Sequence, residues 1–252
     1  FSKTIEKGLI ILNLFDRDHT SRRLSEIAKL TGINKTSVFR FVNTLVKLGY
    51  LRKSPQNNLI RLGPRAFVLG QQFFHGFDIL QSVMPIIDKT FLEHKISIDS
   101  AILHEGTLIS LYRREVANIV YLRLPLIMDE LYARAMGKAV LAHFEPDALE
   151  TFFDNIPFRP LTPKTIMERE TLMAELTLGK ARGYTLNDEE YVKGLTCIGA
   201  PVFNFNTGKV AGAVSLDFPA AEYPIERIES DYTGILTKLA SEMSEIFTLG
   251  DL

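Results

Sequence analysis

Two segments with helical apolar spacing stand close together near the start of the chain. Ser25 can cap the first of them, which runs to Leu30, and the pair Thr31-Gly32 ends it because glycine readily takes the left-handed conformation found at helix ends. Asn34 offers a side-chain oxygen to the free amides of the second helix, which Gly49 ends. The inward stripe of this second helix consists of Val38, Phe41, Val42, Leu45 and Leu48. Two helices joined by so short a turn predict a helix-turn-helix.

Segments on either side complete a winged form of this motif. Residues 4–15 carry apolar side chains three and four positions apart, which predicts a preceding helix. Residues 50–53 and 59–62 have the composition of strands and flank the turn-forming residues 55–58, which predicts a hairpin wing. We therefore expect a winged helix-turn-helix domain, mainly α, over residues 1–63.

A helical pattern continues from Pro64 to about His94. We expect interruptions near Gly76 and at Pro85, because proline inside a helix removes a backbone hydrogen bond. The pattern predicts a linker helix over residues 64–79, which leads into the first helix of a second domain over residues 80–252.

The second domain mixes strands and helices. Two antiparallel hairpins are expected around short turns, one from residues 98–104 with 107–113 and one from residues 196–203 with 209–217. Helices are expected over residues 135–144, 147–153, 165–182 and 225–248. Strand pairs separated by helices predict an α+β domain with a mainly antiparallel sheet.

Charge is divided sharply between the two parts of the chain. Residues 1–76 hold 13 Lys and Arg against 4 Asp and Glu, a net charge of +9, whereas residues 77–252 hold 16 against 26, a net charge of −10. A basic unit joined to an acidic one indicates that the N-terminal part meets a polyanion. The alternative is a solvated basic face without a partner.

Several other classes of protein are disfavoured. No apolar run approaches the roughly 18 to 20 residues of a membrane span, and no signal-peptide pattern opens the sequence, so we expect a cytoplasmic protein without a membrane partner. Cys197 is the single cysteine, and the five histidines show no metal-ligand spacing with it. We expect no metal, no cofactor and no catalytic residues.

The second helix of the motif carries the candidate DNA contacts. Its start supplies Asn34, Lys35, Thr36 and Ser37, short or flexible polar groups that can meet base edges or phosphates. One turn further, Arg40 can hold a phosphate or read a guanine, and Phe39 can touch a thymine methyl group. Arg22 and Arg23 are further candidate DNA contacts, and Arg61 with Asn57 and Asn58 can reach the flanking DNA backbone or the minor groove.

The order of these patterns resembles one known family. The stretches LSEIAKLTGINKTSVFRFVNTLVKLGYL and RLGPRAFVLG resemble the DNA-binding half of the isocitrate-lyase-regulator (IclR) family, and YARAMGKAVLA and LNDEEYVKGLTCIGAPVFNFNTGKVAGAVSLDFP resemble its effector domain. The resemblance implies a bacterial transcriptional regulator that forms a dimer or tetramer. It also implies a GAF-like C-terminal domain that binds a small-molecule effector, often an organic or aromatic acid.

The same resemblance implies the positions of the effector pocket. They are Ala135, Met136, Gly137, Asn187, Leu195, Cys197, Ser215 and Asp217, with Arg134 directly before the first of them. A helix start offers free amides to an anion, and the polar side chains can hydrogen-bond a carboxylate or a hydroxyl group.

The sequence departs from the family pattern at several of these positions. Asn187 replaces a common acidic residue, Asp217 a small hydroxyl residue, Arg134 a Ser or Thr, and Glu130 a proline. We expect Arg134 to pair with Asp217, to receive an effector carboxylate, or to lie exposed at the helix start. Cys197 fits a small buried hydrophobic residue better than a nucleophile.

Three acidic residues, Asp188, Glu189 and Glu190, fit a solvated turn or a helix cap better than a metal site. An enzyme fused to a DNA-binding module and a winged helix that binds protein are the two competing functions. The first needs a catalytic constellation that the sequence does not show, and the second predicts no dependence on DNA sequence. We expect a regulator that binds a pseudo-palindromic, double-stranded operator as a homodimer or homotetramer.

Overall fold

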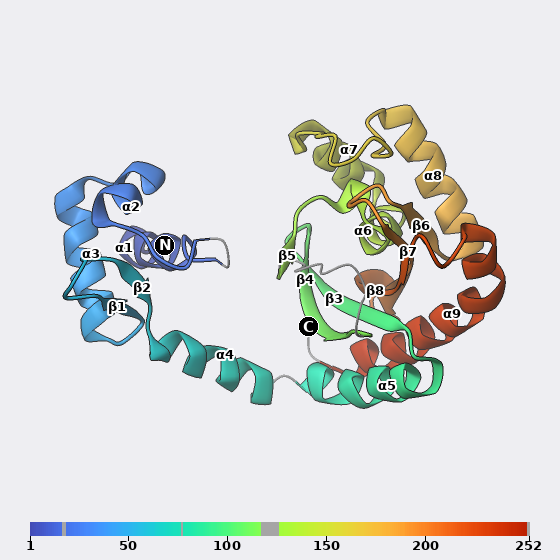
Figure 1. Cartoon of the computed structure of the whole chain (residues 1–252), viewed down its shortest axis with the longest axis horizontal. Helices are drawn as coiled ribbons and strands as arrows, with labels where there is room; N and C mark the ends of the chain where they lie inside the picture. The colour runs from blue at the N-terminus through green and yellow to red at the C-terminus, as the bar shows by residue number, and fades with distance from the viewer. Residues whose placement is uncertain (17–18, 77, 117–125, 251–252) are drawn as a thin grey trace. The chain divides into compact units, whose positions relative to one another are not determined.

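The protein is described here by a computed structural model that covers residues 1–16, 19–76, 78–116 and 126–250. Its contacts divide the chain into two compact units, Phe1–Phe77 and Asp78–Leu252 (Figure 1). The expected linker helix, residues 64–79, crosses this division, and residue 77 within it lies outside the described residues.

Three helices form the body of the N-terminal unit. They are α1 (Lys3–Leu12), α2 (Leu24–Thr31) and α3 (Lys35–Lys47). Gly32 ends α2 with a φ of 66°, as the sequence predicted, because this left-handed conformation suits glycine. The helices enclose one apolar core, which includes Ile11, Ile27, Val38 and Val42. The expected helix-turn-helix is therefore confirmed in its elements.

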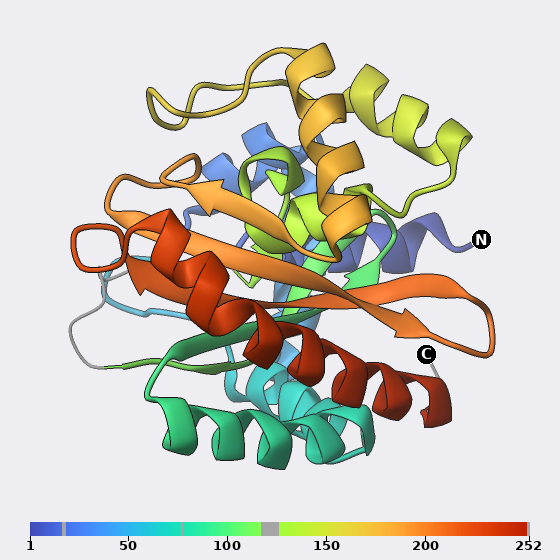
Figure 2. The ribbon, with the colours of Figure 1, turned by 90° about the vertical axis from the view of Figure 1, so that its right-hand side faces the viewer.

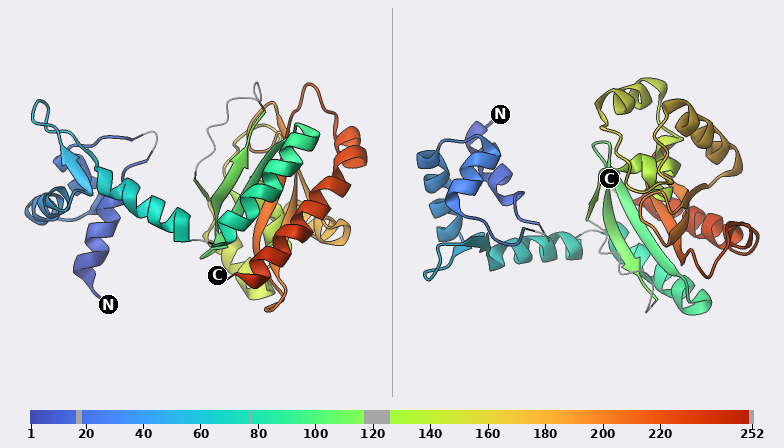
Figure 3. Two further views of the ribbon diagram at one scale, coloured as in Figure 1. Left: turned by 90° about the horizontal axis from the view of Figure 1, so that it is seen from below. Right: turned by 45° about the horizontal axis from the view of Figure 1, so that its top comes forward.

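A two-stranded antiparallel wing follows α3. Its strands are β1 (Leu51–Lys53) and β2 (Ile60–Leu62), and their connecting loop projects from the helices (Figure 3). Ile60 buries its side chain in the helical core, and its backbone exchanges two hydrogen bonds of 2.9 Å with Arg22. The wing is thus tied to the segment that leads into α2. Helix α4 (Pro64–Gly76) then completes the unit.

A six-stranded antiparallel sheet forms the centre of the C-terminal unit. Its order is β5-β4-β3-β8-β7-β6. The strands are β3 (Ser97–His104), β4 (Thr107–Arg114), β5 (Ile127–Met128), β6 (Thr185–Asp188), β7 (Leu195–Asn204) and β8 (Lys209–Pro219). The two predicted hairpins, β3-β4 and β7-β8, are confirmed, and β3 and β8 pair with each other at the middle of the sheet.

Helices cover both faces of this sheet. On one face, α5 (Asp78–His94) and α9 (Ile225–Leu249) run side by side (Figure 2). On the other face, α6 (Ala135–Leu141) packs on β7 and β8 directly after a short 3-10 helix, η1 (Leu131–Ala133). Outside α6 lie α7 (Pro146–Asn155) and α8 (Arg169–Arg182). The α+β class expected from the sequence is confirmed.

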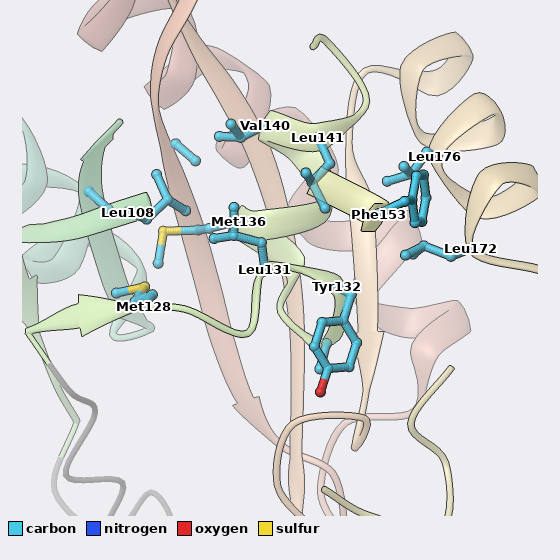
Figure 4. Packing of buried hydrophobic residues seen from close by; sticks show 13 residues of the cluster. Leu108, Met128, Leu131, Tyr132, Met136, Val140, Leu141, Phe153, Leu172 and Leu176 are labelled. Atoms are coloured by element: carbon cyan, nitrogen blue, oxygen red, sulfur yellow. The ribbon is translucent and has the colours of Figure 1, made fainter. Parts of the chain in front are cut away.

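A large apolar cluster fixes α6 against the sheet and the outer helices. Met136, Val140 and Leu141 of α6 lie between Leu108 of β4 and Leu176 of α8 (Figure 4). These side chains are buried. Burial of a large aliphatic side chain contributes about 1.5 to 3 kcal/mol each. The start of α6 is therefore held rigidly over the sheet.

Some local expectations are wrong. Helix α2 has Arg23, not Ser25, at its N-cap, because the Arg23 backbone N–H donates to the Glu26 carboxylate at 2.7 Å. Helix α5 continues through Pro85, since burial of flanking apolar side chains compensates for the one hydrogen bond that proline cannot make. Helix α8 begins at Arg169 and not at Thr165. The short edge strands β5 and β6 were not expected from the sequence.

Candidate DNA-binding surface and effector cavity

The start of α3 is an exposed polar surface. Asn34 caps the helix, as predicted, because its Oδ1 accepts the backbone N–H of Ser37 at 2.9 Å. Lys35, Thr36 and Arg40 are exposed beyond the cap. Phe39 is also exposed, at 49% of its surface. Nothing in the N-terminal core requires an exposed phenylalanine here, so this helix end can offer both charged and apolar contacts.

The other predicted DNA contacts differ in burial and in whether their side chains already form hydrogen bonds within the protein. Arg22 is half-buried, and its Nε donates to the Leu14 carbonyl at 2.8 Å, so part of this guanidinium serves the fold. Arg23 is exposed at the start of α2. On the wing, Asn57 Oδ1 accepts the Leu59 N–H at 3.0 Å, and Asn58 takes a positive φ of 57°. Both asparagines therefore shape the turn as well as lying on its surface.

The wing also carries a second arginine, Arg52, that was not among the predicted DNA contacts. Arg61 is exposed on β2, and its cross-strand partner on β1 is Arg52, which is exposed too. Side chains directly opposite in an antiparallel pair project from the same face, so two guanidinium groups stand together. The composition of the first strand, Leu-Arg-Lys, was the signal that could have revealed this pair.

A small cavity lies in the C-terminal unit between α6 and the sheet. Its floor is made of two adjacent rows of cross-strand partners, one of Asn187, Cys197 and Asp217 and a second of Gly199, Ser215 and Asp99. Residues two apart on a strand face the same side, so both rows face α6. The cavity has a volume of about 20 Å³, which is room for about one water molecule.

Glycine at one floor position lets α6 come close. A Cβ atom on Gly199 would lie 2.6 Å from the Ala135 carbonyl carbon and 2.7 Å from the Met136 nitrogen. The Ala135 carbonyl also accepts a hydrogen bond of 2.6 Å from the Thr185 hydroxyl on β6. Direct contact between helix start and sheet therefore defines the roof of the cavity.

Eight of the nine residues expected in the effector pocket line this cavity. They are Arg134, Ala135, Met136, Asn187, Leu195, Cys197, Ser215 and Asp217. Gly137 is not among the lining residues; a Cβ there would lie 2.2 Å from the Leu131 carbonyl oxygen, so its role is close packing against η1. Asp99 and Tyr191 line the cavity and were missed. The carboxylate inside the predicted strand 98–104 was the available signal for Asp99. That these residues bind an effector stays a prediction.

A buried charge cluster crosses the floor. Arg113 on β4 donates from Nη1 to Asp99 Oδ2 at 3.1 Å and lies 3.6 Å from Asp217 Oδ2. Ser215 donates its hydroxyl to Asp217 Oδ1 at 2.8 Å. Burial, and next the neighbouring Asp217 carboxylate, raise the pKa of Asp99 to about 7, although Arg113 acts in the opposite direction. Burial alone would lower the pKa of Arg113, but Asp217 and Asp99 raise it.

The expected pairing of Arg134 with Asp217 is wrong, and Arg134 is not an exposed residue. The residue is 5% exposed, its guanidinium lies 3.5 Å from the centre of the Tyr191 ring, and its Nη2 donates to Glu130 at 3.4 Å. The tyrosine that follows the acidic turn offers the guanidinium a favourable π face. Arg113, which the sequence did not single out, takes the place beside Asp217.

The acidic residues at the end of β6 lie in two different environments, one exposed and one buried. Asp188 and Glu189 meet the exposed Lys164 at 3.0 and 2.9 Å, which fits the predicted solvated turn. Glu190 instead is buried and accepts a hydrogen bond of 2.6 Å from Lys138 of α6, itself fully buried. Asn187 Oδ1 accepts the Glu190 N–H at 2.8 Å. The turn beside the cavity is thus fixed both to α6 and to the sheet.

Cys197 lies on β7 as a buried thiol. Burial, and next the Asp217 carboxylate, raise the pKa of the Cys197 thiol well above its ordinary value, so it stays protonated. This agrees with the predicted small buried residue. In the part of the chain that the structure describes, no cluster of His, Cys, Asp and Glu could hold a metal ion. Nor does any helix among these residues have the length and apolar character to cross a membrane.

Comparison with known proteins covers both units. The family described as the IclR helix-turn-helix domain matches residues 4–55, and the family described as the bacterial transcriptional regulator IclR C-terminal domain matches residues 71–245. The Escherichia coli regulator XynR is 29% identical over 216 residues, which cover 85% of each chain.

Two solved structures show the same fold over nearly the whole length. The IclR regulator from Alicyclobacillus acidocaldarius has a TM-score of 0.86 at 20% identity and matches over 98% of this chain and 99% of its own. An IclR homologue from Microbacterium hydrocarbonoxydans, solved in complex with 4-hydroxybenzoate, has a TM-score of 0.78 at 21% identity over 98% of this chain and all of its own. The chain belongs to the IclR family of bacterial transcriptional regulators, DNA-binding proteins and not enzymes.

Proposed function

We propose that the protein binds a pseudo-palindromic operator in the cytoplasm as a homodimer or homotetramer, and that an organic or aromatic acid in the α6 cavity controls this binding. The observation that carries the proposal is the combination of an exposed, basic α3 start in one unit with a cavity of buried polar groups in the other. A single recognition helix reads only a few base pairs, so a two-fold protein gains specificity from a two-fold site.

Exposed apolar side chains on α1 and α4 support self-association. Ile5 and Leu9 stand one turn apart on α1 and are 64% and 55% exposed, and Phe67 and Leu69 of α4 are 69% and 56% exposed. These helices are apolar on surfaces that the N-terminal core does not use. Apolar patches of this kind mark interfaces with other chains, and a second copy of the same unit is the partner that a pseudo-palindromic operator requires.

An effector in the cavity can act only through a difference in its affinity for two arrangements of the assembly. The start of α6 and the sheet rows that bear Ser215 and Asp217 would hold the ligand. The tightly packed roof supports this proposal, because a ligand cannot enter a cavity of about 20 Å³ without displacing its lining. The lining would then have two arrangements, one in the free protein and one with the ligand bound.

The operator contact can be tested on the full chain with DNA from its own upstream region. We expect Arg40→Ala to weaken specific binding by about 1 to 3 kcal/mol if it reads a base, and Lys35→Ala to lower affinity almost uniformly and reduce the salt slope by about one unit. Lys209→Ala, an exposed lysine of the C-terminal unit, is the matched control. Unchanged affinity in both α3 variants would refute the recognition helix, and a strict monomer in light scattering on and off DNA would refute the dimer.

A further inference from the structure

Two arginines stand directly opposite each other on the outer face of the wing. Arg52 of β1 and Arg61 of β2 are cross-strand partners, and both are exposed. Ile60, which precedes Arg61, directs both of its backbone hydrogen-bonding groups to Arg22 and not to β1. These groups alternate in direction along an antiparallel strand, so Arg61 directs its own toward Arg52, and the two Cα atoms lie about 5.5 Å apart. The two guanidinium groups therefore start from neighbouring backbone positions.

No acidic side chain neutralises this pair within the described residues. Residues 50–76 contain no aspartate and no glutamate. In the part of the chain that the structure describes, neither guanidinium group has an ion-pair or hydrogen-bond partner. Like charges directly opposite each other destabilise a strand pair, and the strands here are only three residues long. An anion against this face would remove the repulsion, so the pair indicates a polyanionic partner for the wing itself.

The hairpin limits the direction in which the pair points. Leu51 and Ile60, each next to one of the arginines, are buried in the N-terminal core. Because side chains alternate along a strand, Arg52 and Arg61 point away from this core. Strand β1 also contacts α3, so the pair is carried by the same compact unit as the recognition helix (Figure 1).

The side chains of the wing tip add mainly hydrogen-bond donors. Asn57 Oδ1 accepts the Leu59 N–H at 3.0 Å, and Gln56 Oε1 accepts the Ser54 hydroxyl at 3.0 Å. Both amide oxygens are thus used inside the turn, which leaves the NH₂ groups of these exposed residues as free donors. Guanidinium groups have no acceptor either. The outer face and the tip of the wing therefore fit a surface made of acceptors.

The minor groove of A·T-rich DNA is such a surface. A·T pairs present only the acceptors adenine N3 and thymine O2 there, whereas G·C pairs add the 2-amino group of guanine, which is a donor. The groove is about 6 Å wide in B-DNA and narrower in A·T tracts, where its negative potential is enhanced. A guanidinium group is more weakly hydrated than an ammonium group and loses less on entering it. Phosphates accept hydrogen bonds too, but they carry no sequence information, so sequence dependence separates the two partners.

We propose that Arg52 and Arg61 together enter the minor groove beside the bases that α3 reads, and that they give the protein a preference for A·T pairs there. This inference rests on the proposed function and deepens it. It adds a second determinant of operator sequence and assigns it to the arginine pair, of which Arg52 was not a predicted DNA contact.

Modified base pairs test how the preference is read. The full-length protein first selects its binding sites from a random duplex library, and Arg40→Ala identifies the bases that α3 reads. The A·T pairs next to these bases are then replaced by G·C and by inosine·C pairs. Inosine lacks the 2-amino group of guanine, so an inosine·C pair resembles A·T in the minor groove and G·C in the major groove. We expect G·C to weaken binding about tenfold and inosine·C to restore most of the loss.

Lysine and alanine variants assign the effect to the pair. With Arg52→Lys and Arg61→Lys combined, the charge stays, so the salt slope should persist while the preference for A·T falls to about twofold or less. With both residues changed to alanine, the preference and about two units of salt slope should be lost. Both arginines are exposed, so neither double variant should lower the melting temperature. Arg65→Ala, which removes an exposed arginine of α4, is the matched control and should keep the preference.

The outcomes separate this inference from the proposed function. If a sequence is enriched but A·T pairs beside the α3 bases are neither selected nor preferred over G·C, or if inosine·C behaves as G·C, only the inference is overturned. The same holds if the double lysine variant keeps the full preference. If no sequence is enriched over the starting library, the proposed operator binding fails together with the inference.

Discussion

The carboxyl group of Asp99 should make the stability of the C-terminal unit depend on pH. Its pKa is about 7 in the folded protein, raised first by burial and then by Asp217, against a value of 3.8 without these surroundings. Between these two values the folded state holds a proton that the unfolded state has lost, so the free energy of unfolding falls as pH rises. Arg113 from β4, Cys197 from β7 and Glu115, which lies 3.6 Å from Arg113, are further titratable groups that act on this cluster.

The size of the effect follows from the shift. A difference of one pKa unit corresponds to about 1.4 kcal/mol, so this carboxyl group costs the folded state about 4 kcal/mol above pH 7 and only about 1.5 kcal/mol at pH 5. Asp99→Asn removes the titration. The free energy of unfolding of the variant minus that of the wild type should therefore be about 2.5 kcal/mol larger at about pH 8 than at about pH 5. Any pH-independent effect of the substitution cancels in this comparison.

Urea unfolding followed by tyrosine fluorescence measures this difference. The chain has no tryptophan and 8 tyrosines, and apart from Tyr50 all of them lie in residues 78–252, so the signal reports mainly on the C-terminal unit. Asp147→Asn, on the exposed start of α7, should keep the wild-type pH dependence. If Asp99→Asn has the same pH dependence as the wild type, the proton is not held at Asp99 and the reasoning is refuted.

Three further substitutions test the packing of both units. Gly137→Ala should destabilise the C-terminal unit by about 1 to 3 kcal/mol, since the added Cβ would lie 2.2 Å from the Leu131 carbonyl oxygen. Thermal unfolding measures this loss, and an unchanged melting temperature would show that η1 moves to accommodate the methyl group at little cost. Lys138→Met should cost about 3 to 5 kcal/mol in urea unfolding because Glu190 keeps a buried carboxyl without its partner, and adding Glu190→Gln should recover part of the loss. A double variant no more stable than the single one would contradict this. Asn34→Ala should lower the stability of the N-terminal unit by about 1 kcal/mol through loss of the α3 cap, measured by helical circular dichroism, whereas an unaltered transition would mean that water replaces the cap.

The sequence predicted those elements whose signals are local. Gly32 ends α2 and Asn34 caps α3 because a left-handed glycine and a side-chain acceptor act within a few residues. The hairpins β3-β4 and β7-β8 were predictable because turn residues separate two apolar runs. Strands β5 and β6 were not predicted because short edge strands carry no hydropathy pattern of their own. They are defined by their pairing with β4 and β7.

Eight of the nine residues that the resemblance implied line one cavity, but the charges around that cavity depend on the register of the strands. Asp99 and Arg113 become partners because β3 and β4 pair with these residues opposite each other, and Asp217 joins them because β8 lies on the other side of β3. A shift of one residue in either pairing would turn one of these side chains to the opposite face of the sheet. Since three strands must align before the cluster exists, the nearby Arg134 was the natural but wrong choice as the partner of Asp217. Arg134 instead meets Glu130 and the Tyr191 ring, neither of which a strand pattern could indicate.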